Sequence, residues 1–185
     1  MATQNGESWS RGLPASCVMM VLATSTGAGL ATWAAANPEL SKEIDAMIFV
    51  SPNFGVQASG SFLLDLPWGR QMANLIIGAE REFKPENELH AKFWTPKYPT
   101  DAILPMAALT KLARDTRVED IKTPTFFIYA QTDKVVRPDL TKERIARWGG
   151  PSETMIVTNP DDPYQHVVAG DALSPSKTEE VTAKA

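Results

Sequence analysis

The sequence predicts an α/β protein in which a parallel sheet is flanked by helices, and two observations support that class. Short, continuous apolar runs at residues 18–22, 46–50 and 124–130 have the length and composition of buried strands. Helical patterns lie between them, an alanine-rich stretch at 26–37 and an apolar stripe at 101–117. Strands that alternate with helices favour a parallel sheet with helices on both faces.

Composition narrows the classes of function. The chain has 185 residues, 43% of them hydrophobic, and a net charge of −4, which fits one domain with a buried core. Lysine and arginine are scattered, so no nucleic-acid partner is expected. No apolar run reaches the roughly 18 residues of a membrane span, and no Cys/His cluster has metal-ligand spacing. We expect neither a metal nor a cofactor.

The N-terminal region bears on the compartment of the protein. Arg11 and the apolar residues after it imitate a secretory signal, but Glu7 and Pro14 interrupt the pattern. We therefore expect a cytoplasmic protein that keeps this segment. The single cysteine, Cys17, leaves no internal disulfide, and its place in an apolar run predicts a buried structural thiol.

A serine stands where the first predicted strand changes to helix. Ser25 has Ala23 two residues before it and Gly27 two residues after it, so small residues would let a sharp turn close. Strand, serine and helix in this order match the nucleophile elbow, with alanine in the first glycine position. The Ser25 hydroxyl would then lie at the positive end of a helix, where the Thr26 N–H can donate to an oxyanion. Taken alone, the pattern also fits an ordinary strand-to-helix turn.

The second half of the chain continues the alternation of strands and helices. Residues 139–148 are predicted to be a helix, 153–158 a fourth strand, and 174–185 a short terminal helix. Asp133 follows the strand at 124–130 directly, and His166 follows the loop after the fourth strand. Functional groups gather at the carboxyl ends of parallel strands, so we expect both side chains to meet the serine there.

Other residues could take these positions. The second histidine, His90, lies in a different segment, which leaves His166 as the candidate base. Turn aspartates are common, and three of them are alternatives to Asp133: Asp139, Asp161 and Asp162.

Residues 54–99 are too long for a plain loop. Gly, Ser, Pro and aromatic residues mix there with short helical patterns such as 68–77, and we predict a small, mostly helical cap. About half of its aromatics should form its own small core. The aromatics are Phe62, Trp68, Phe83, Phe93, Trp94 and Tyr98. The predicted substrate-binding residues are Trp68, Phe93, Trp94 and, in the helix at 101–117, Met106.

The chain order Ser25, Asp133, His166 is that of the α/β-hydrolases and differs from the trypsin and subtilisin orders. Together with residues 23–27 and 132–136, it gives a resemblance to the α/β-hydrolase superfamily, in particular its lid-bearing esterase, carboxylesterase and monoacylglycerol-lipase-like members. The resemblance implies that Ser25 is the nucleophile, His166 the general base and Asp133 the acid that orients it. It also implies a carboxylic ester as the small-molecule substrate. The apolar cap favours acyl or aryl esters over charged ones.

The sequence departs from the family pattern in its first residues. Family members normally have about four strands before the elbow, and a loop there supplies a second oxyanion donor. Residues before 17 cannot hold them, so the chain corresponds to the C-terminal part of the fold. Its core would be 14–53 and 100–185, with the cap at 54–99. We therefore keep two alternatives: an inactive fragment with a structural or interaction role, and another acyl hydrolase such as a thioesterase or aminopeptidase.

The same departure affects the edge of the sheet. The strand at 17–22 would keep the strand at 46–50 as one neighbour and lose the other. An unguarded apolar edge recruits another chain. The sequence therefore predicts a weakly active homo-oligomer joined through this strand.

Overall fold

The computed structural model describes residues 18–58, 60, 64, 66 and 68–185. The predictions for Cys17 and Phe62 lie outside these residues.

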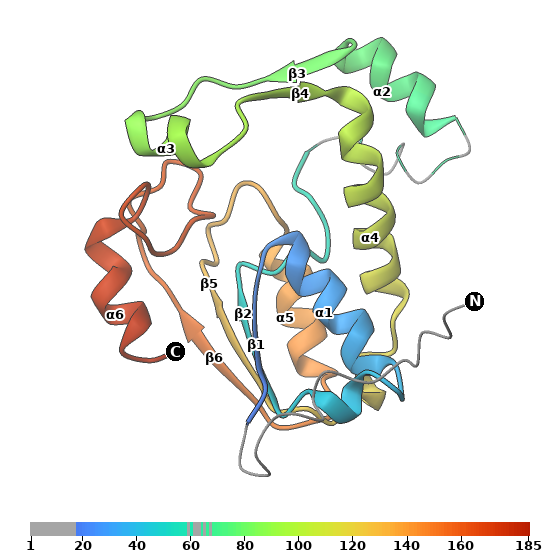
Figure 1. The fold of residues 1–185 in the computed structure, drawn as a ribbon, viewed down its shortest axis with the longest axis vertical. Coiled ribbons are helices and arrows are strands. Elements are labelled where there is room, and N and C mark those ends of the chain that lie inside the picture. The colour runs from blue at the N-terminus through green and yellow to red at the C-terminus, as the bar shows by residue number, and fades with distance from the viewer. Residues whose placement is uncertain (1–17, 59, 61–63, 65, 67) are drawn as a thin grey trace, which may run out of the picture.

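Four parallel strands form the central sheet, in the order β1-β2-β5-β6 (Figure 1). This confirms the predicted fold class, a parallel sheet flanked by helices. The strands are β1 (Met20–Thr24), β2 (Ala46–Val50), β5 (Thr125–Tyr129) and β6 (Ser152–Ile156). Among the described strands, β1 pairs with β2 alone, so it forms one edge of the sheet, as the sequence predicts.

Helices cover the two faces unequally. Helices α1, α4 and α5 lie on one side of the sheet and the short α6 on the other (Figure 1). Their bounds are α1 (Thr26–Ala36), α4 (Ile103–Asp115), α5 (Pro138–Ala146) and α6 (Thr178–Thr182). Helix α1 ends at Ala36, because the next residue, Asn37, precedes Pro38 and has an extended backbone. Short 3-10 turns among the described residues join these elements: η2 (Ser41–Glu43), η4 (Thr100–Ala102), η5 (Val118–Asp120) and η6 (Pro175–Lys177).

Alternation along the strands separates two hydrophobic clusters. On the helix-rich face, Phe49 and Phe127 are fully buried, and each meets the ring of Trp148 edge-on. Small residues of α1, such as Ala28, let this helix lie close to the sheet in the same cluster. On the other face, Ile128 packs with Val181 of α6.

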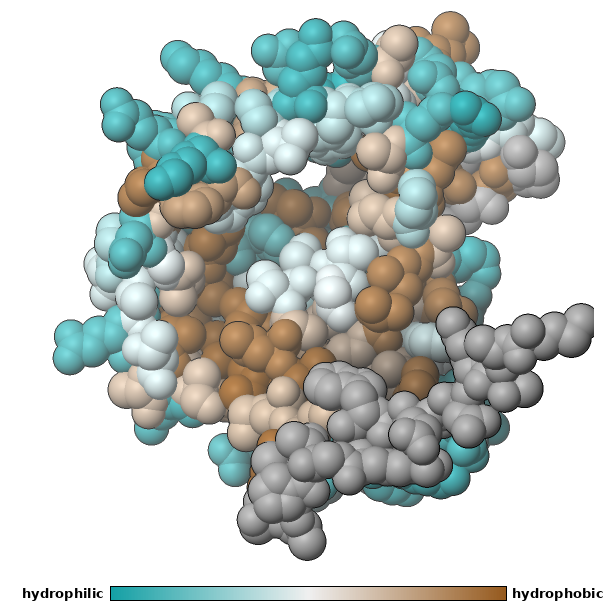
Figure 2. Space-filling view, viewed as in Figure 1, coloured by the Kyte–Doolittle hydropathy of each residue, from teal (hydrophilic) through white to brown (hydrophobic). Residues whose placement is uncertain are grey.

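The second face is uncovered over β1. Leu22 is 66% exposed and Met20 55% exposed, although Ile48 of the neighbouring strand is buried. On the α1 side of this edge, Leu30 and Trp33 are exposed as well. Apolar residues gather on this part of the surface in Figure 2. The open edge therefore coincides with exposed apolar side chains, Met20 and Leu22 on the strand itself and Leu30 and Trp33 on the adjoining helix.

The segment between β2 and α4 lies over the carboxyl ends of the strands (Figure 1). It contains α2 (Gly69–Ile77), β3 (Glu80–Glu82), α3 (Glu88–Phe93) and β4 (Lys97–Pro99). The antiparallel pair β3-β4 was not expected in a mostly helical cap. The ring of His90 stacks on Phe83 and meets Trp94 edge-on, which gives the segment a small core of its own.

Candidate active site

Ser25 occupies a strained turn between β1 and α1. Its backbone angles are φ 51° and ψ −120°, a region that residues other than glycine rarely adopt. Three backbone hydrogen bonds hold the turn: the Ser25 N–H donates to Val50 O (2.9 Å), and Ser25 O accepts from the N–H groups of Ala28 (3.1 Å) and Asn53 (3.0 Å). The strain is thus fixed by the helix and by the neighbouring strand, and Ser25 lies at a sharp turn from strand to helix.

The small residues around the serine have different roles. Ala23 is buried under α1, in agreement with the requirement for a small side chain. A Cβ added at Gly27 would meet nothing within 4 Å, so glycine is not needed there to close the turn. The close approach occurs at Gly29, where an added Cβ would lie 3.2 Å from Cβ of Ala113 in α4.

Asp133 lies in the turn after β5, and its carboxylate is almost fully buried, with 1% of the side chain exposed. Oδ1 accepts hydrogen bonds from the N–H groups of Val135 (2.8 Å) and Val136 (2.9 Å). The Asp133 carbonyl accepts from Nε2 of Gln57 (3.1 Å). These bonds fix the carboxylate and leave Oδ2 directed at His166.

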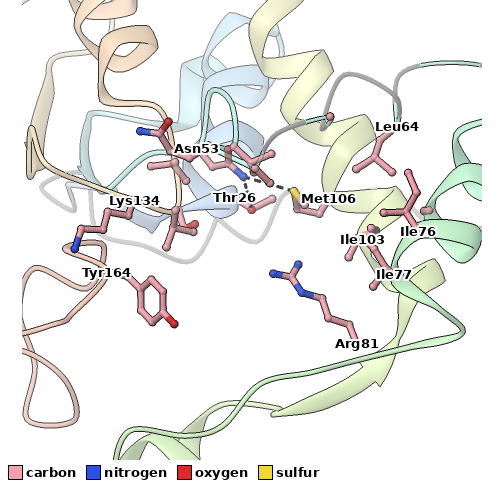
Figure 3. A pocket seen from close by; sticks show the side chains of 18 of the residues that line it. Thr26, Asn53, Leu64, Ile76, Ile77, Arg81, Ile103, Met106, Lys134 and Tyr164 are labelled. Carbon is pink, nitrogen blue, oxygen red and sulfur yellow. Dashed lines mark hydrogen bonds between the residues drawn. The ribbon is translucent and has the colours of Figure 1, made fainter.

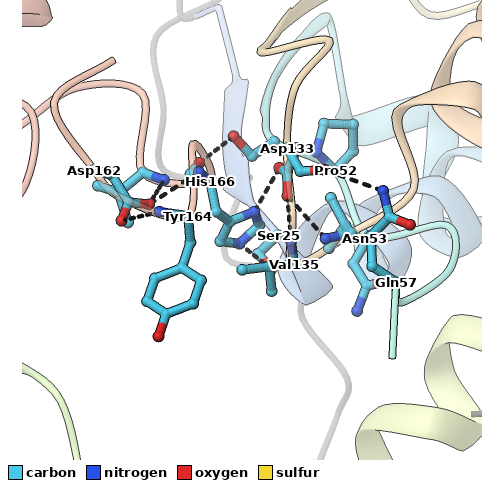
Figure 4. Close-up of polar contacts among 12 residues, drawn as sticks. Ser25, Pro52, Asn53, Gln57, Asp133, Val135, Asp162, Tyr164 and His166 are labelled. Atoms are coloured by element: carbon cyan, nitrogen blue, oxygen red, sulfur yellow. Dashed lines mark hydrogen bonds and ion pairs between the residues drawn. The ribbon is translucent and has the colours of Figure 1, made fainter. Parts of the chain in front are cut away.

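The structure brings Ser25, His166 and Asp133 into one hydrogen-bonded row (Figure 4). His166 Nδ1 lies 2.8 Å from Asp133 Oδ2, and Nε2 lies 3.1 Å from Ser25 Oγ. The imidazole is 15% exposed, so it reaches solvent on one side only. A serine, a histidine and a carboxylate in this order can carry a proton away from the serine hydroxyl.

Asp162, one of the alternatives to Asp133, has another role. Its Oδ2 accepts from the N–H groups of His166 (2.9 Å) and Val167 (2.8 Å), and its Oδ1 accepts from the N–H of Tyr164 (3.0 Å). The hydroxyl of Ser51 donates to the carbonyl of His166 (2.6 Å). Asp162 and Ser51 therefore position the loop that carries the imidazole.

The other two alternatives bond elsewhere. Asp139 pairs with Arg137 at the start of α5, and Asp161 accepts hydrogen bonds from Ser176. These contacts lower the pKa of both carboxyl groups, mainly through the side-chain hydrogen bonds with Arg137 and Ser176. Neither carboxylate bonds to the imidazole.

A cavity of about 660 Å³ opens at the serine, between the sheet and the segment that covers it (Figure 3). Of the predicted site residues, Ser25, Thr26 and Met106 line it, whereas Trp68, Phe93 and Trp94 do not. Trp68 and Phe93 are more than half exposed, and Trp94 packs on His90 instead. Other described residues of the lining are Asn53, Val56, Gln57, Ala58, Gly60, Leu64, Met72, Ala73, Ile76, Ile77, Arg81, Ile103, Lys134, Val135, Val136 and Tyr164.

Asn53 is a site residue that the sequence analysis did not single out. Its Nδ2 donates to Thr26 Oγ1 (3.1 Å) and lies 3.6 Å from Met106 Sδ, while its buried Oδ1 has no partner among the described residues. Thr26 is the first residue of α1, where backbone N–H groups have no acceptor inside the helix. Asn53 follows β2 closely, so the rule that groups gather beyond the carboxyl ends of strands could have pointed to it.

Two further findings concern the described part of the chain. No group of three His, Cys, Asp or Glu side chains there could hold a metal ion. None of its helices is both long enough and apolar enough to cross a bilayer.

The sequence matches no protein-family model and no curated protein. Several solved structures are nevertheless similar. One comes from work on LipS and LipT, two metagenome-derived lipolytic enzymes; it has a TM-score of 0.67 and 18% identity, over 91% of this chain and 63% of its own. A monoacylglycerol lipase from Paleococcus ferrophilus has a TM-score of 0.62 and 12% identity, over 90% and 66% respectively.

A soluble variant of monoglyceride lipase from Saccharomyces cerevisiae, in complex with a substrate analogue, has a TM-score of 0.61 and 11% identity, over 91% of this chain and 60% of its own. This chain thus spans 60–66% of the length of these three structures. At such identities the likeness concerns the backbone, and these neighbours are all α/β-hydrolase fold proteins. This chain therefore has the α/β-hydrolase fold.

Proposed function

We propose that this protein cleaves carboxylic esters through a covalent acyl-enzyme formed on Ser25. The observation that carries the proposal is the hydrogen-bonded row of Ser25, His166 and Asp133, with separations of 3.1 and 2.8 Å. Lipolytic enzymes among the similar structures agree with this chemistry at the level of the fold.

Each step follows from these three side chains. Nε2 of His166 takes the hydroxyl proton as Oγ of Ser25 attacks the acyl carbon, and the carbonyl oxygen becomes an oxyanion. When this intermediate collapses, the ester C–O bond breaks and the leaving alcohol takes the proton from Nε2. A water molecule then attacks the acyl carbon and gives its proton to the same nitrogen. The bond between the acyl carbon and Oγ of Ser25 breaks, Oγ takes the proton back from Nε2, and the acid is released, with Asp133 holding the imidazole throughout.

The N–H of Thr26 would donate to the oxyanion. Removal of one of two such donors typically lowers turnover about 100- to 1000-fold. With Thr26 as the one assigned donor, we expect slow turnover of an activated ester.

Residues 54–99 would act as the cap over this site, with the core at 14–53 and 100–185. Apolar side chains from this segment and from α4, such as Leu64, Ile76, Ile77 and Ile103, line the cavity beside Ser25. An apolar wall of this kind suits the acyl or alcohol chain of an ester. Trp68, Phe93 and Trp94 are not needed for this role.

Labelling with a fluorescent fluorophosphonate tests the proposal, because the reagent reacts with an activated serine. The wild-type chain should be labelled and should hydrolyse 4-nitrophenyl butyrate, and Ser25→Ala should do neither. Ser176→Ala is the matched control, since this serine bonds Asp161 away from the cavity. A folded wild-type chain that is neither labelled nor active would contradict the proposal and favour an inactive structural domain.

A further inference from the structure

The charges that line the cavity are of one sign. Two charged side chains occur among the described lining residues, Arg81 and Lys134, and no Asp or Glu is among them. The whole chain has more acidic than basic residues and a net charge of −4, whereas the charged residues of the lining are basic. The binding partners of Arg81 and Lys134 therefore decide what this lining can recognise.

Alternation along β3 sets the direction of Arg81. Residues next to each other in a strand point to opposite faces, so Glu80 and Glu82 lie on one face and Arg81 on the other. On the first face, Lys97 of β4 forms an ion pair with Glu80 (2.8 Å). Figure 3 shows the Arg81 side chain directed into the cavity. The strand therefore separates Arg81 from the two carboxylates nearest to it in sequence.

Other arginines of this protein pair with carboxylates. Arg70, Arg137 and Arg147 bond to acidic side chains, and these bonds raise the pKa of each. The side chain of Arg81 forms no hydrogen bond or ion pair with the residues that the structure describes. Lys134 differs, because its Nζ donates to the carbonyl of Pro163 (2.9 Å) and its side chain is directed away from the centre of the cavity in Figure 3.

Apolar residues occupy the lining along with Ser25 and Arg81. Ile76, Ile77 and Ile103 are among them, and they line the same cavity as Arg81. A guanidinium with free donors in such a cavity matches a planar or tetrahedral oxyanion, which it can bind through two hydrogen bonds. The lining thus combines an apolar surface with one anion-binding group.

We propose that Arg81 is a specificity-determining residue that selects esters bearing an anionic group, a carboxylate or a phosphate, separated from the scissile carbonyl by an apolar chain. The inference rests on the proposed function for the position of the carbonyl at Ser25. It revises the expectation that the cavity favours uncharged esters.

Binding tests the inference without turnover. The Ser25→Ala variant is titrated calorimetrically with monomethyl suberate, with octyl phosphate and with neutral methyl octanoate. We expect at least one anion to bind about tenfold more tightly than methyl octanoate, the lower end for a hydrogen bond to a charged group. Whichever anion binds identifies the oxyanion as a carboxylate or a phosphate. Equal affinity for all three, or binding of none, overturns the inference whatever the activity of the wild type.

Substitution then assigns the effect to one side chain. Arg81→Met should abolish the tenfold preference and leave the affinity for methyl octanoate unchanged, and Arg81→Lys should retain part of it because the charge remains. Lys84→Met is the matched control: it removes one positive charge from an exposed residue three positions away that does not line the cavity. A preference that persists in Arg81→Met, or that Lys84→Met removes equally, contradicts the role of Arg81. Thermal unfolding of each variant verifies that it is folded.

Kinetics separate this inference from the proposed function. The wild-type chain is given 4-nitrophenyl octanoate and the mono-4-nitrophenyl ester of suberic acid, and kcat/KM is compared for each. Turnover of both esters at the same rate would leave the esterase proposal intact and overturn the role of Arg81. Turnover of neither, with anion binding retained by Ser25→Ala and lost in Arg81→Met, would contradict the esterase proposal alone.

Discussion

Nδ1 of His166 lies 2.8 Å from Oδ2 of Asp133, while Oδ1 of the same carboxylate accepts two backbone N–H groups. Each hydrogen bond between this carboxylate and the described residues has a donor on the partner's side, so the position suits a side chain whose two oxygens both accept. The carboxylate therefore fixes which nitrogen of the imidazole carries the proton and which faces Ser25.

Asp133→Asn should lower kcat severely, by about 10⁴-fold, with little change in KM. The amide NH₂ must face either the two backbone N–H groups or the imidazole Nδ1–H, so either orientation sets a donor against a donor. Steady-state kinetics with 4-nitrophenyl butyrate measure the loss. Retention of most of the wild-type kcat would exclude Asp133 as the orienting acid.

Asp162→Asn is the matched comparison, because this carboxylate also accepts from backbone N–H groups but does not touch the imidazole. We expect a lower melting temperature together with a smaller loss of kcat, since the loop of His166 loses its anchor. Thermal unfolding and kinetics on the same preparations distinguish the two carboxylates. Equal losses of kcat in both variants would show that loop position, not direct contact, accounts for the Asp133 effect.

Ser25→Ala and His166→Ala should each remove nearly all esterase activity and leave the fold intact. Members of one catalytic unit act together, so the double variant should be no slower than either single one. Turnover of 4-nitrophenyl butyrate measures this, and circular dichroism verifies folding. Additive losses would mean that the two residues act separately.

Substitution by alanine should destabilise the protein at one glycine and have little effect at another. A Cβ at Gly149 would lie 1.9 Å from the carbonyl oxygen of Glu119, so Gly149→Ala should destabilise the protein by about 1–3 kcal/mol or more. Gly27→Ala should keep both stability and activity, because the added Cβ meets nothing within 4 Å and alanine favours the helix. Chemical denaturation measures the free energy of unfolding of each variant. A large loss of stability or activity in Gly27→Ala would restore the requirement for glycine in the elbow.

The edge strand β1 should join copies of the chain. Its outer backbone groups have no strand partner among the described residues, and Met20 and Leu22 are exposed beside them. We propose a second copy as the occupant, because the chain itself supplies an equivalent open edge. Sedimentation at low micromolar concentration should show an oligomer for the wild type and a shift to monomer for Leu22→Lys. Lys84→Met should stay oligomeric, and a monomeric wild type would show that the edge is not an interface.

Much of the sheet and of the candidate site is predictable from the sequence. Buried parallel strands are continuous apolar runs, so β1, β2 and β5 are recognisable, although β6 begins at Ser152 and ends at Ile156, slightly earlier than its pattern indicates. Ser25, Asp133 and His166 follow from their places after strands, because parallel strands bring such residues to one edge.

Other features of the fold and of the site depend on tertiary contacts, which the sequence alone does not reveal. Strand β3 is three exposed, charged residues, and nothing in Glu-Arg-Glu marks a strand or shows that its arginine reaches the cavity. The aromatic residues Phe93 and Trp94 were expected at the substrate, but aromatic character alone does not say which side of a short helix faces the site. Asp162 acts through backbone N–H groups, and no spacing rule identifies such partners.

The pairing of β2 with β5 encloses α2, β3, α3, β4 and α4 in one connection. The entropic cost of closing a flexible loop grows only with the logarithm of its length, and a doubling adds about 0.6 kcal/mol. Insertions and deletions between α2 and β4 should therefore have little effect on the stability of the sheet, whereas α4 packs Ala113 into the core. Much of the cavity wall, Arg81 included, comes from the same connection. Substrate preference in this protein can consequently diverge through changes of segment length that leave the strands and the serine turn unaltered.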